Sequence, residues 1–361
     1  MPKRILILTT KKGGHRGSSD AIKNAVFALN PDVDVNAADA MVCYPGYTGK
    51  DDEKGYVAFT TQFRFFWKLF YEFTSFFKGF SNFILYKTIF KRFKKMISEY
   101  KPDIILSVHP CFVGSVGKCL KKLKLKIPFY TCIIDPVKHS RLWHDKKCDI
   151  TFVPTVKMYD ELLKKGFKKE NLVHSGFPIN EKFSAVNKKP KTEISLPNVL
   201  MVSPSPKRDK VSLEFILAAL KHNIILTVVT GSDEKLKKYL DKKLSGIENV
   251  TVLGYISDMD KRLSDADILI AKAGPNMILE AVKMCVPVLI TGNILGQEEK
   301  NYQYIVENQY GLKCGSPKKL SAAMDLLFKN DYELLKRFSH IEQSCADISG
   351  AKVIAKYLVE N

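Results

Sequence analysis

Residues 268–281 read ILIAKAGPNMILEA, and this segment decides the fold of the second half of the chain. Its first four residues form a continuous apolar run, which is typical of a strand buried on both faces of a parallel sheet. Gly274 then permits close approach to the backbone, and Pro275 suits the first turn of a helix whose exposed amides attract a pyrophosphate. Glu280, about one turn further in, offers a carboxylate that can accept both hydroxyls of a ribose.

Short apolar runs alternate with helical stretches along the rest of the chain. Further strands are expected at 4–8, 103–108, 129–134, 150–153, 199–202, 224–229, 250–253 and 288–290. Strands separated by helices indicate parallel sheets, so we expect an α/β protein with two doubly wound, Rossmann-like domains. We expect an N-terminal domain over 1–183, a linker over 184–197, a C-terminal domain over 198–330, and closing helices over 331–361 that pack back on the N-terminal domain.

Composition narrows the possible partners and compartments. The chain has 361 residues, a hydrophobic fraction of 45% and a formal net charge of +19, which implies an anionic partner such as nucleic acid, an acidic membrane surface or a phosphate-bearing substrate. Its eight cysteines are scattered singly, which favours neither a zinc site nor a disulfide framework and fits a reducing, cytosolic setting. No run of about 18 apolar residues occurs, so we expect no membrane-spanning helix.

The first strand runs into a loop rich in glycine, at residues 9–20, that reads TTKKGGHRGSSD. Gly14 and its glycine neighbour allow a ligand to approach the backbone, and His15 projects from the loop at the end of the strand. The following helix is expected over 21–29, with Ser18 or Ser19 as its N-cap. For His15 the alternative is an ordinary tight turn that carries a solvated histidine.

Two more strand ends in the first half offer ionisable groups. His109 follows the strand at 103–108, and Asp135 follows the strand at 129–134. Because ligands bind outside the carboxyl ends of such strands, His15, His109 and Asp135 are candidates for the base that takes a proton from an acceptor hydroxyl. A metal site is the competing interpretation of the histidines, but the spacing of His109, His139 and His144 matches no standard zinc pattern, and we expect no metal.

A polar loop follows the strand at 288–290. It reads LGQEEKN over 295–301, and the amide of Gln297 beside the carboxylate of Glu298 can bind sugar hydroxyls. Taken singly, this loop and the helix after Lys272 are also compatible with a capped helix and an ordinary polar turn. Their order and spacing together favour a site for a nucleotide sugar.

The chain resembles the monogalactosyldiacylglycerol synthase and processive diacylglycerol glucosyltransferase group, which are relatives of the MurG-type inverting glycosyltransferases with the GT-B fold. The matching segments are GGHRGSSDAI from Gly13, IIDPVKHSRLWHD from Ile133, HSGFPINEKF from His174, GYISDMDKRLSDADILIAKAGPNMILEAV from Gly254 and GQEEKNYQYIVENQYG from Gly296. They span nearly the whole chain in a consistent order.

The resemblance implies a role for each matching residue. It implies that the backbone of Gly254-Tyr255-Ile256 contacts the nucleobase of the donor and that Glu280 holds the ribose. It implies that Gly274, Pro275 and the adjoining Asn276 lie by the diphosphate. It also implies that Gln297 and Glu298 contact the donor sugar. His15 and Asp135 fall where the family keeps its candidate catalytic groups, and the resemblance leaves open which of them takes the proton. Relatives carry a glycine-rich loop after the first strand of the second domain, whereas this chain has SPSPKR at 203–208. There the hydroxyl of Ser203 and the cations Lys207 and Arg208, with Lys272, are expected to replace the amide cradle.

An aromatic and basic stretch covers Tyr56 to Ile97. It interleaves many phenylalanines with lysine and arginine, and Glu72 is its one acidic residue. Amphipathic, aromatic and basic character together favour a helix at the surface of an anionic membrane, where each cation contributes about 1 kcal/mol. The alternatives are a mostly buried helix pair and single-stranded nucleic acid, but no strand pattern of a nucleic-acid-binding module accompanies the stretch.

We therefore expect an inverting enzyme that moves a hexose, glucose or galactose, from a UDP-sugar to a diacylglycerol-type lipid. It needs no cofactor or nucleic acid, and it acts peripherally on the cytoplasmic face of a membrane. The rival enzymes are a MurG-like transferase on a polyprenyl diphosphate and a sugar-nucleotide epimerase. The non-enzyme rival is a basic nucleic-acid-binding protein, which would show salt-dependent binding and no transfer.

Overall fold

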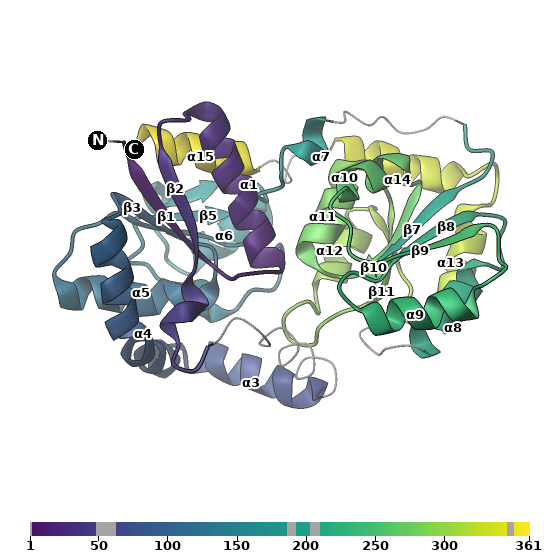
Figure 1. Ribbon diagram of the computed structural model, residues 1–361. Helices are drawn as coiled ribbons and strands as arrows, with labels where there is room; N and C mark the ends of the chain where they lie inside the picture. The colour runs from purple at the N-terminus through teal and green to yellow at the C-terminus, as the bar shows by residue number, and fades with distance from the viewer. Residues whose placement is uncertain (1, 48–62, 186–192, 203–209, 345–349) are drawn as a thin grey trace. The chain divides into compact units, whose positions relative to one another are not determined.

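The computed structural model describes residues 2–47, 63–185, 193–202, 210–344 and 350–361. The chain divides into two compact units, Met1–Glu181 with Leu295–Gln297 and Ala346–Asn361, and Lys182–Ile294 with Glu298–Cys345. Each unit contains one six-stranded sheet in which every paired strand is parallel (Figure 1). The predicted pair of doubly wound α/β domains is confirmed.

The first sheet has the strand order β2-β1-β3-β4-β5-β6. Its strands are β1 (Arg4–Thr9), β2 (Asp34–Asp39), β3 (Ile104–Ser107), β4 (Phe129–Cys132), β5 (Ile150–Val153) and β6 (Leu172–His174). The helices of this unit are α1 (Gly14–Leu29), α3 (Arg64–Phe76), α4 (Lys78–Tyr100), α5 (Val113–Leu123), α6 (Val156–Lys164) and α15 (Gly350–Glu360). The strand order reverses direction between β1 and β3, so the loops after these two strands flank the position where such sheets bind ligands.

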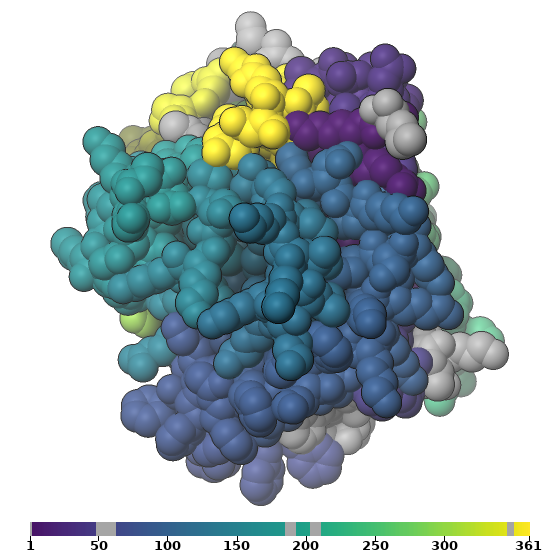
Figure 2. Space-filling view, turned by 90° about the vertical axis from the view of Figure 1, so that its left-hand side faces the viewer, coloured from purple at the N-terminus to yellow at the C-terminus, as the bar shows by residue number. Residues whose placement is uncertain are grey.

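The two faces of the first sheet are covered by two pairs of helices. Helix α1 packs with α15 on one face and α4 packs with α5 on the other (Figure 1). Figure 2 shows α15, in yellow, against the purple N-terminal segment, where the Lys3 ammonium donates to the Val359 carbonyl at 3.2 Å. The C-terminal helix is therefore an integral layer of the first unit.

The second sheet has the strand order β12-β11-β10-β7-β8-β9. Its strands are β7 (Asn198–Val202), β8 (Ile225–Val229), β9 (Val250–Leu253), β10 (Ile268–Lys272), β11 (Val288–Gly292) and β12 (Gly311–Lys313). The helices of this unit are α7 (Lys182–Ala185), α8 (Lys210–Ala219), α9 (Glu234–Lys243), α10 (Met259–Asp265), α11 (Pro275–Lys283), α12 (Asn301–Glu307), α13 (Pro317–Leu327) and α14 (Glu333–Gln343). This is the order of dinucleotide-binding sheets, and its reversal lies between β7 and β10.

Two local expectations need correction. Helix α1 begins at Gly14 with Gly13 as its N-cap, so the prediction of a helix over 21–29 capped by Ser18 or Ser19 was wrong. Gly13 has a φ of 81°, a left-handed conformation that glycine adopts readily, and this lets the chain turn directly from β1 into the helix. His15 therefore lies in the first helical turn and not in a loop.

Three strands were missed in the sequence. β2, β6 and β12 are short or polar strands, and β6 and β12 have three residues each. All three lie at sheet edges, where one side of the strand is unpaired and continuous apolar character is not required.

Candidate active site

The imidazole of His15 is held by the backbone at the reversal point of the first sheet. Its Nδ1 lies 2.7 Å from the carbonyl oxygen of Val108, the residue that follows β3. Since a carbonyl only accepts hydrogen bonds, Nδ1 carries the hydrogen and Nε2 keeps a lone pair. The Val108 carbonyl is itself fixed, because the Val108 amide donates to Leu8 of β1 at 3.0 Å. The site thus presents a neutral imidazole with Nε2 available to accept a proton.

Burial keeps this imidazole neutral. Desolvation lowers the pKa of His15 to about 4, and the hydrogen bond to Val108 opposes the shift only in part. The positive end of the α1 dipole also disfavours a charged ring in the first helical turn. His15 is consequently in its proton-accepting form throughout the neutral pH range.

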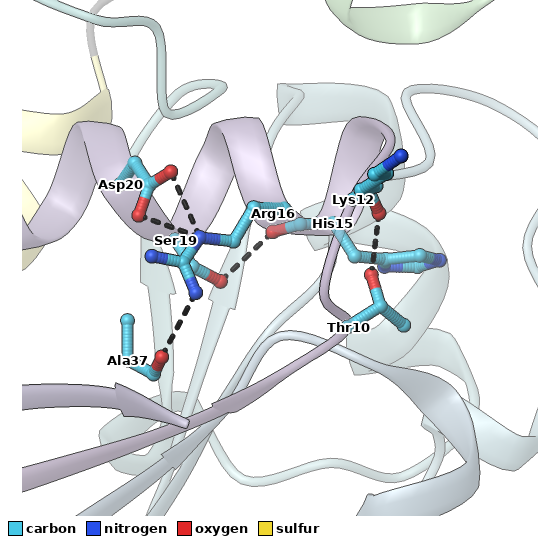
Figure 3. A network of polar contacts seen from close by, with 7 residues as sticks. All are labelled: Thr10, Lys12, His15, Arg16, Ser19, Asp20 and Ala37. Carbon is cyan, nitrogen blue, oxygen red and sulfur yellow. Dashed lines mark hydrogen bonds and ion pairs between the residues drawn. The ribbon is translucent and has the colours of Figure 1, made fainter. Parts of the chain in front are cut away.

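Local contacts fix the turn that carries His15 (Figure 3). The Ser19 hydroxyl donates to the His15 carbonyl at 2.8 Å, and the Thr10 hydroxyl donates to the Lys12 carbonyl at 2.8 Å. Arg16 donates to Asp20 at 2.9 Å, and its guanidinium and the imidazole of His15 point to opposite sides of the helix. The position of the His15 ring is therefore set by the backbone and by its own helix.

The structure brings the other two candidates of the first unit into the same cluster. The rings of His15 and His109 lie 4.4 Å apart between centroids, and burial followed by the neighbouring His15 lowers the pKa of His109 well below its ordinary value. The buried carboxylate of Asp135 accepts a hydrogen bond from Nε1 of Trp143 at 2.9 Å. The Trp143 ring lies 6.3 Å from that of His15 between centroids and so links Asp135 to the histidines.

His139 and His144 form a separate pair in contact through their Nε2 atoms. Within the described residues, no group of three or more histidine, cysteine and acidic side chains is placed to hold a metal ion.

In the second unit, the predicted phosphate-binding turn is built at the reversal point of the sheet. Helix α11 begins at Pro275 with Gly274 as its N-cap, which confirms the predicted helix start. The pairing of β10 with β11 shifts register between Ala271 and Lys272, and a Cβ built on Gly274 would lie 3.8 Å from Cε of Lys272. The first-turn amides of α11 and one cation, Lys272, thus lie together where an anion would be stabilised.

Glu298 is a structural anchor of this turn. Its buried carboxylate accepts the Ile294 amide at 2.8 Å and lies 3.4 Å from the Lys272 ammonium. A Cβ built on Gly274 would lie 3.8 Å from the same carboxylate, so Glu298 adjoins the start of α11. Gln297, the preceding residue, is grouped with the first unit.

Glu280 projects from α11 and is largely desolvated. Burial raises its pKa to about 8, although the positive charge of Lys182 opposes the shift. The carboxylate therefore gains or loses its charge near neutral pH.

The remaining predicted positions lie after β9 and in the first turn of α11. Tyr255 follows β9 with 79% of its surface exposed, Ile256 is half-buried beside it, and Asn276 is half-buried in the first turn of α11. Ser203, Lys207 and Arg208 lie outside the described residues.

Several residues that build the two sites had no assigned role in the sequence. Trp143 is fully buried and holds Asp135, and Val108 acts through its main chain. Buried Asn301 donates from Nδ2 to the Ala273 carbonyl at 2.9 Å and fixes the turn before α11. The aromatic Trp143 within LWHD gave a detectable signal, whereas the role of Val108 depends on its carbonyl and gave none.

Comparisons with known proteins agree with the two-part architecture. Residues 15–179 match the family model described as monogalactosyldiacylglycerol (MGDG) synthase, and residues 185–343 match the one described as glycosyl transferases group 1. Over its first half, the chain is similar to MGDG synthases. Similar relatives include monogalactosyldiacylglycerol synthase 3, chloroplastic, of Arabidopsis thaliana, which is 28% identical over 93% of this chain and 77% of the relative. A probable monogalactosyldiacylglycerol synthase of Glycine max is 29% identical, and the match covers 89% of this chain and 64% of that relative.

Solved structures show the same fold as this chain. MurG of Acinetobacter baumannii superimposes with a TM-score of 0.63 at 11% identity, and the match covers 100% of both chains. UDP-GlcNAc 2-epimerase of Neisseria meningitidis, bound to UDP-GlcNAc, also gives a TM-score of 0.63, at 12% identity over 99% of this chain and 100% of that chain. At these identities the likeness establishes the GT-B fold alone.

Proposed function

We propose that this protein transfers a hexose from a UDP-sugar to the free hydroxyl of a diacylglycerol-type lipid, with inversion at the anomeric carbon. The observation that carries the proposal is the neutral His15, whose Nδ1–H is bound to Val108 and whose Nε2 is available, in a chain whose first half is similar to MGDG synthases. A lipid hydroxyl is a poor nucleophile until its proton is removed, and a positioned imidazole supplies the base.

The chemical step follows from these residues. The lipid hydroxyl oxygen forms a bond to the anomeric carbon as its proton passes to Nε2 of His15, and the bond from that carbon to the diphosphate oxygen breaks. UDP leaves with the electron pair. The carboxylate of Asp135, in the same cluster, favours the transient imidazolium, and the neutral ring of His109 shapes its surroundings.

Most of the proposed donor contacts lie in the second unit. The first-turn amides of α11, from Gly274 through Pro275 and Asn276, stabilise the diphosphate together with Lys272. The Glu280 carboxylate accepts hydrogen bonds from the ribose hydroxyls, and the backbone of Tyr255 and Ile256 contacts the nucleobase. Gln297 and Glu298 contact the donor sugar. Gly14, Ser203, Lys207 and Arg208 complete the proposed set of donor contacts.

Membrane attachment is proposed for α3 and the first turns of α4. Helix α3 buries none of its residues, and its phenylalanines are open to solvent, among them Phe65, Phe66 and Phe73 at 72%, 61% and 50% exposure. Lys87 and Lys91 of α4 are exposed near this surface in sequence. An apolar face of this size flanked by cations matches the chemistry of an anionic lipid surface.

In the described part of the chain, no helix combines the length and apolar character needed to cross a bilayer. We propose that the protein acts peripherally, on the cytoplasmic face of a membrane.

An activity assay tests the transfer. We expect radiolabelled hexose to pass from UDP-galactose or UDP-glucose to diacylglycerol in mixed vesicles, with His15→Ala lowering kcat by at least about 100-fold. Asp135→Asn is expected to lower kcat by a smaller factor, of about tenfold or more, because it acts on the imidazolium and not on the reacting atoms. Transfer at the wild-type rate by both variants would refute the assignment of the base, and no transfer by the wild type would refute the function.

A vesicle experiment tests the membrane surface. We expect Phe66→Ser with Phe73→Ser to weaken flotation with phosphatidylcholine vesicles containing one fifth phosphatidylglycerol by about tenfold or more, since each exposed ring loses its apolar contact. Phe27→Ser is the matched control, because Phe27 of α1 is equally open at 61% exposure. Equal loss in the control, or binding that ignores lipid charge, would contradict the proposal.

A further inference from the structure

Lys182 occupies a junction in the second unit that the proposed chemistry does not use. It is the first residue of α7, and its ammonium lies 3.1 Å from the Asp260 carboxylate and 3.3 Å from the Ser257 carbonyl. Ser257 ends the loop that follows β9, and Asp260 lies in the first turn of α10. One side chain therefore ties α7 to the loop that carries Tyr255 and Ile256.

The charge of Lys182 also acts on the candidate ribose ligand. Helix α7 packs against α11, and Lys182 is the charged group whose field opposes the upward pKa shift of Glu280. The other charged side chains near α11 do not shift that pKa. Lys272 on β10 pairs with Glu298. On α14, Lys336 pairs with Asp331, and Arg337 donates to Gln309. The remaining charged or titratable residues are Lys283 on α11 and Glu333 and His340 on α14.

The Asp260 carboxylate responds to the same cation. Burial alone would raise the pKa of Asp260, but the hydrogen bond and charge of Lys182 lower it below its ordinary value. Asp260 is therefore a permanent anion above acidic pH and holds Lys182 in place, whereas Glu280 titrates near pH 8. The Lys182 ammonium is therefore held in place by Asp260, and its positive charge acts on Glu280.

We propose that Lys182 is a positioning residue of the nucleotide site, which fixes the loop at 254–257 and, from α7 packed against α11, favours the charged form of the Glu280 carboxylate that accepts the ribose hydroxyls of a nucleoside diphosphate. A charged carboxylate accepts two hydroxyl hydrogen bonds, whereas the protonated acid accepts them poorly and must donate its own proton. This inference rests on the proposed role of Glu280 in donor binding. It adds the residue that determines over which pH range the role is performed.

The test is calorimetric titration of the full-length protein with UDP from pH 7.0 to 9.5, above the range near pH 6 in which a terminal phosphate titrates. We expect wild-type affinity to rise with pH and to level off above about pH 8, as Glu280 loses its proton. Lys182→Met is expected to move that midpoint upward by about 0.5–1 pH unit and to raise Kd at pH 7 about three- to tenfold, since one unit corresponds to a factor of ten.

Three further variants separate the two effects of Lys182. Lys182→Arg keeps the charge and should retain the wild-type midpoint. Asp260→Asn keeps the cation but weakens its anchor, so Kd should rise about twofold at every pH with little movement of the midpoint. Glu280→Gln should remove the pH dependence. Circular dichroism on heating checks that each variant is folded.

The outcomes distinguish this inference from the function on which it rests. If Glu280→Gln flattens the profile while Lys182→Met leaves midpoint and Kd unchanged, the role of Lys182 is refuted and that of Glu280 stands. If Glu280→Gln keeps wild-type affinity and pH dependence, the ribose assignment fails and the inference fails with it.

Discussion

At the scale of residues, the two ionisable groups of the candidate sites have opposite pKa shifts that suit opposite charge states. Burial lowers the pKa of His15 to about 4, so the proposed base is neutral and can accept a proton at neutral pH. Burial raises the pKa of Glu280 to about 8, so this proposed ribose-binding carboxylate is only partly charged there. The same physical cause, desolvation of the charged form, therefore keeps one group active and makes the other sensitive to pH.

These shifts predict different pH profiles for the two kinetic parameters. With donor saturating, kcat should stay level from pH 7 to about pH 5 and fall only as His15 is protonated near pH 4. With donor well below KM, kcat/KM should fall as pH drops below about 8, because Glu280 becomes protonated in the free enzyme. Initial rates on diacylglycerol vesicles measure both. A kcat midpoint near 6.5, the ordinary value for histidine, would contradict the assignment of the buried His15 as the base.

The sequence predicted which side chains form the cluster in the first unit, but it did not predict their protonation states. His15, His109 and Asp135 were found because each follows a predicted buried strand, and the parallel sheet brings strand ends to one edge. The tautomer of His15 was not predictable, because its partner is a main-chain carbonyl that any residue at position 108 would supply.

At the scale of elements, the central strands were predictable and the edges were not. Apolar runs such as that of β10 occur where both faces of a sheet are covered, whereas β2 has exposed and polar positions that resemble a loop. The start of α1 was misplaced because Gly13-Gly14 suggests a turn, and here the turn is confined to Gly13. The helix pair of α1 and α15, which joins the two ends of the chain, is a long-range contact with no local signal.

Docking of α15 predicts a glycine that does not tolerate a side chain. A Cβ on Gly350 would lie 2.1 Å from the Gly176 carbonyl oxygen, and the Gly350 amide donates to Phe177 at 2.7 Å. Gly350→Ala must therefore displace α15 from backbone, which should destabilise the first unit by about 1–3 kcal/mol. Gly79→Ala in the same unit is the control, because nothing lies within 4 Å of its Cβ position. Urea unfolding followed by tryptophan fluorescence measures both, and equal midpoints for the two variants would overturn the prediction.

At the scale of the whole molecule, the titrating groups are unevenly distributed. His15, His109, His139 and His144 all belong to the first unit, and the pKa of each is lowered, chiefly by burial. Protons then bind more tightly to the unfolded first unit, so its stability is complete above about pH 6.5 and is lost as pH falls toward 4. Glu280 in the second unit has a raised pKa, so its contribution to stability is present below about pH 4.5 and is lost as pH rises through about 8.

The two units should consequently respond to acid differently. The chain has two tryptophans, Trp67 and Trp143, and both lie in the first unit, so intrinsic fluorescence reports on that unit alone. Each kcal/mol lost lowers a melting midpoint by about 2–4 °C, and we expect the fluorescence midpoint to fall by about 5 °C or more between pH 6.5 and 4. Circular dichroism, which detects both units, should show a second transition that shifts less. A fluorescence midpoint that does not change over this range would contradict the lowered histidine pKa values.

The carbonyl that orients His15 has a consequence for genetics. An orienting carboxylate can be deleted by a single codon change, but a main-chain acceptor persists whatever amino acid the codon specifies. In a saturation mutagenesis screen, position 108 should therefore tolerate small apolar residues and reject large or charged ones, as a packed position does, because Val108 is fully buried. Position 15 should reject every replacement. Loss-of-function alleles at position 108 would then report on packing and not on the hydrogen bond that orients His15.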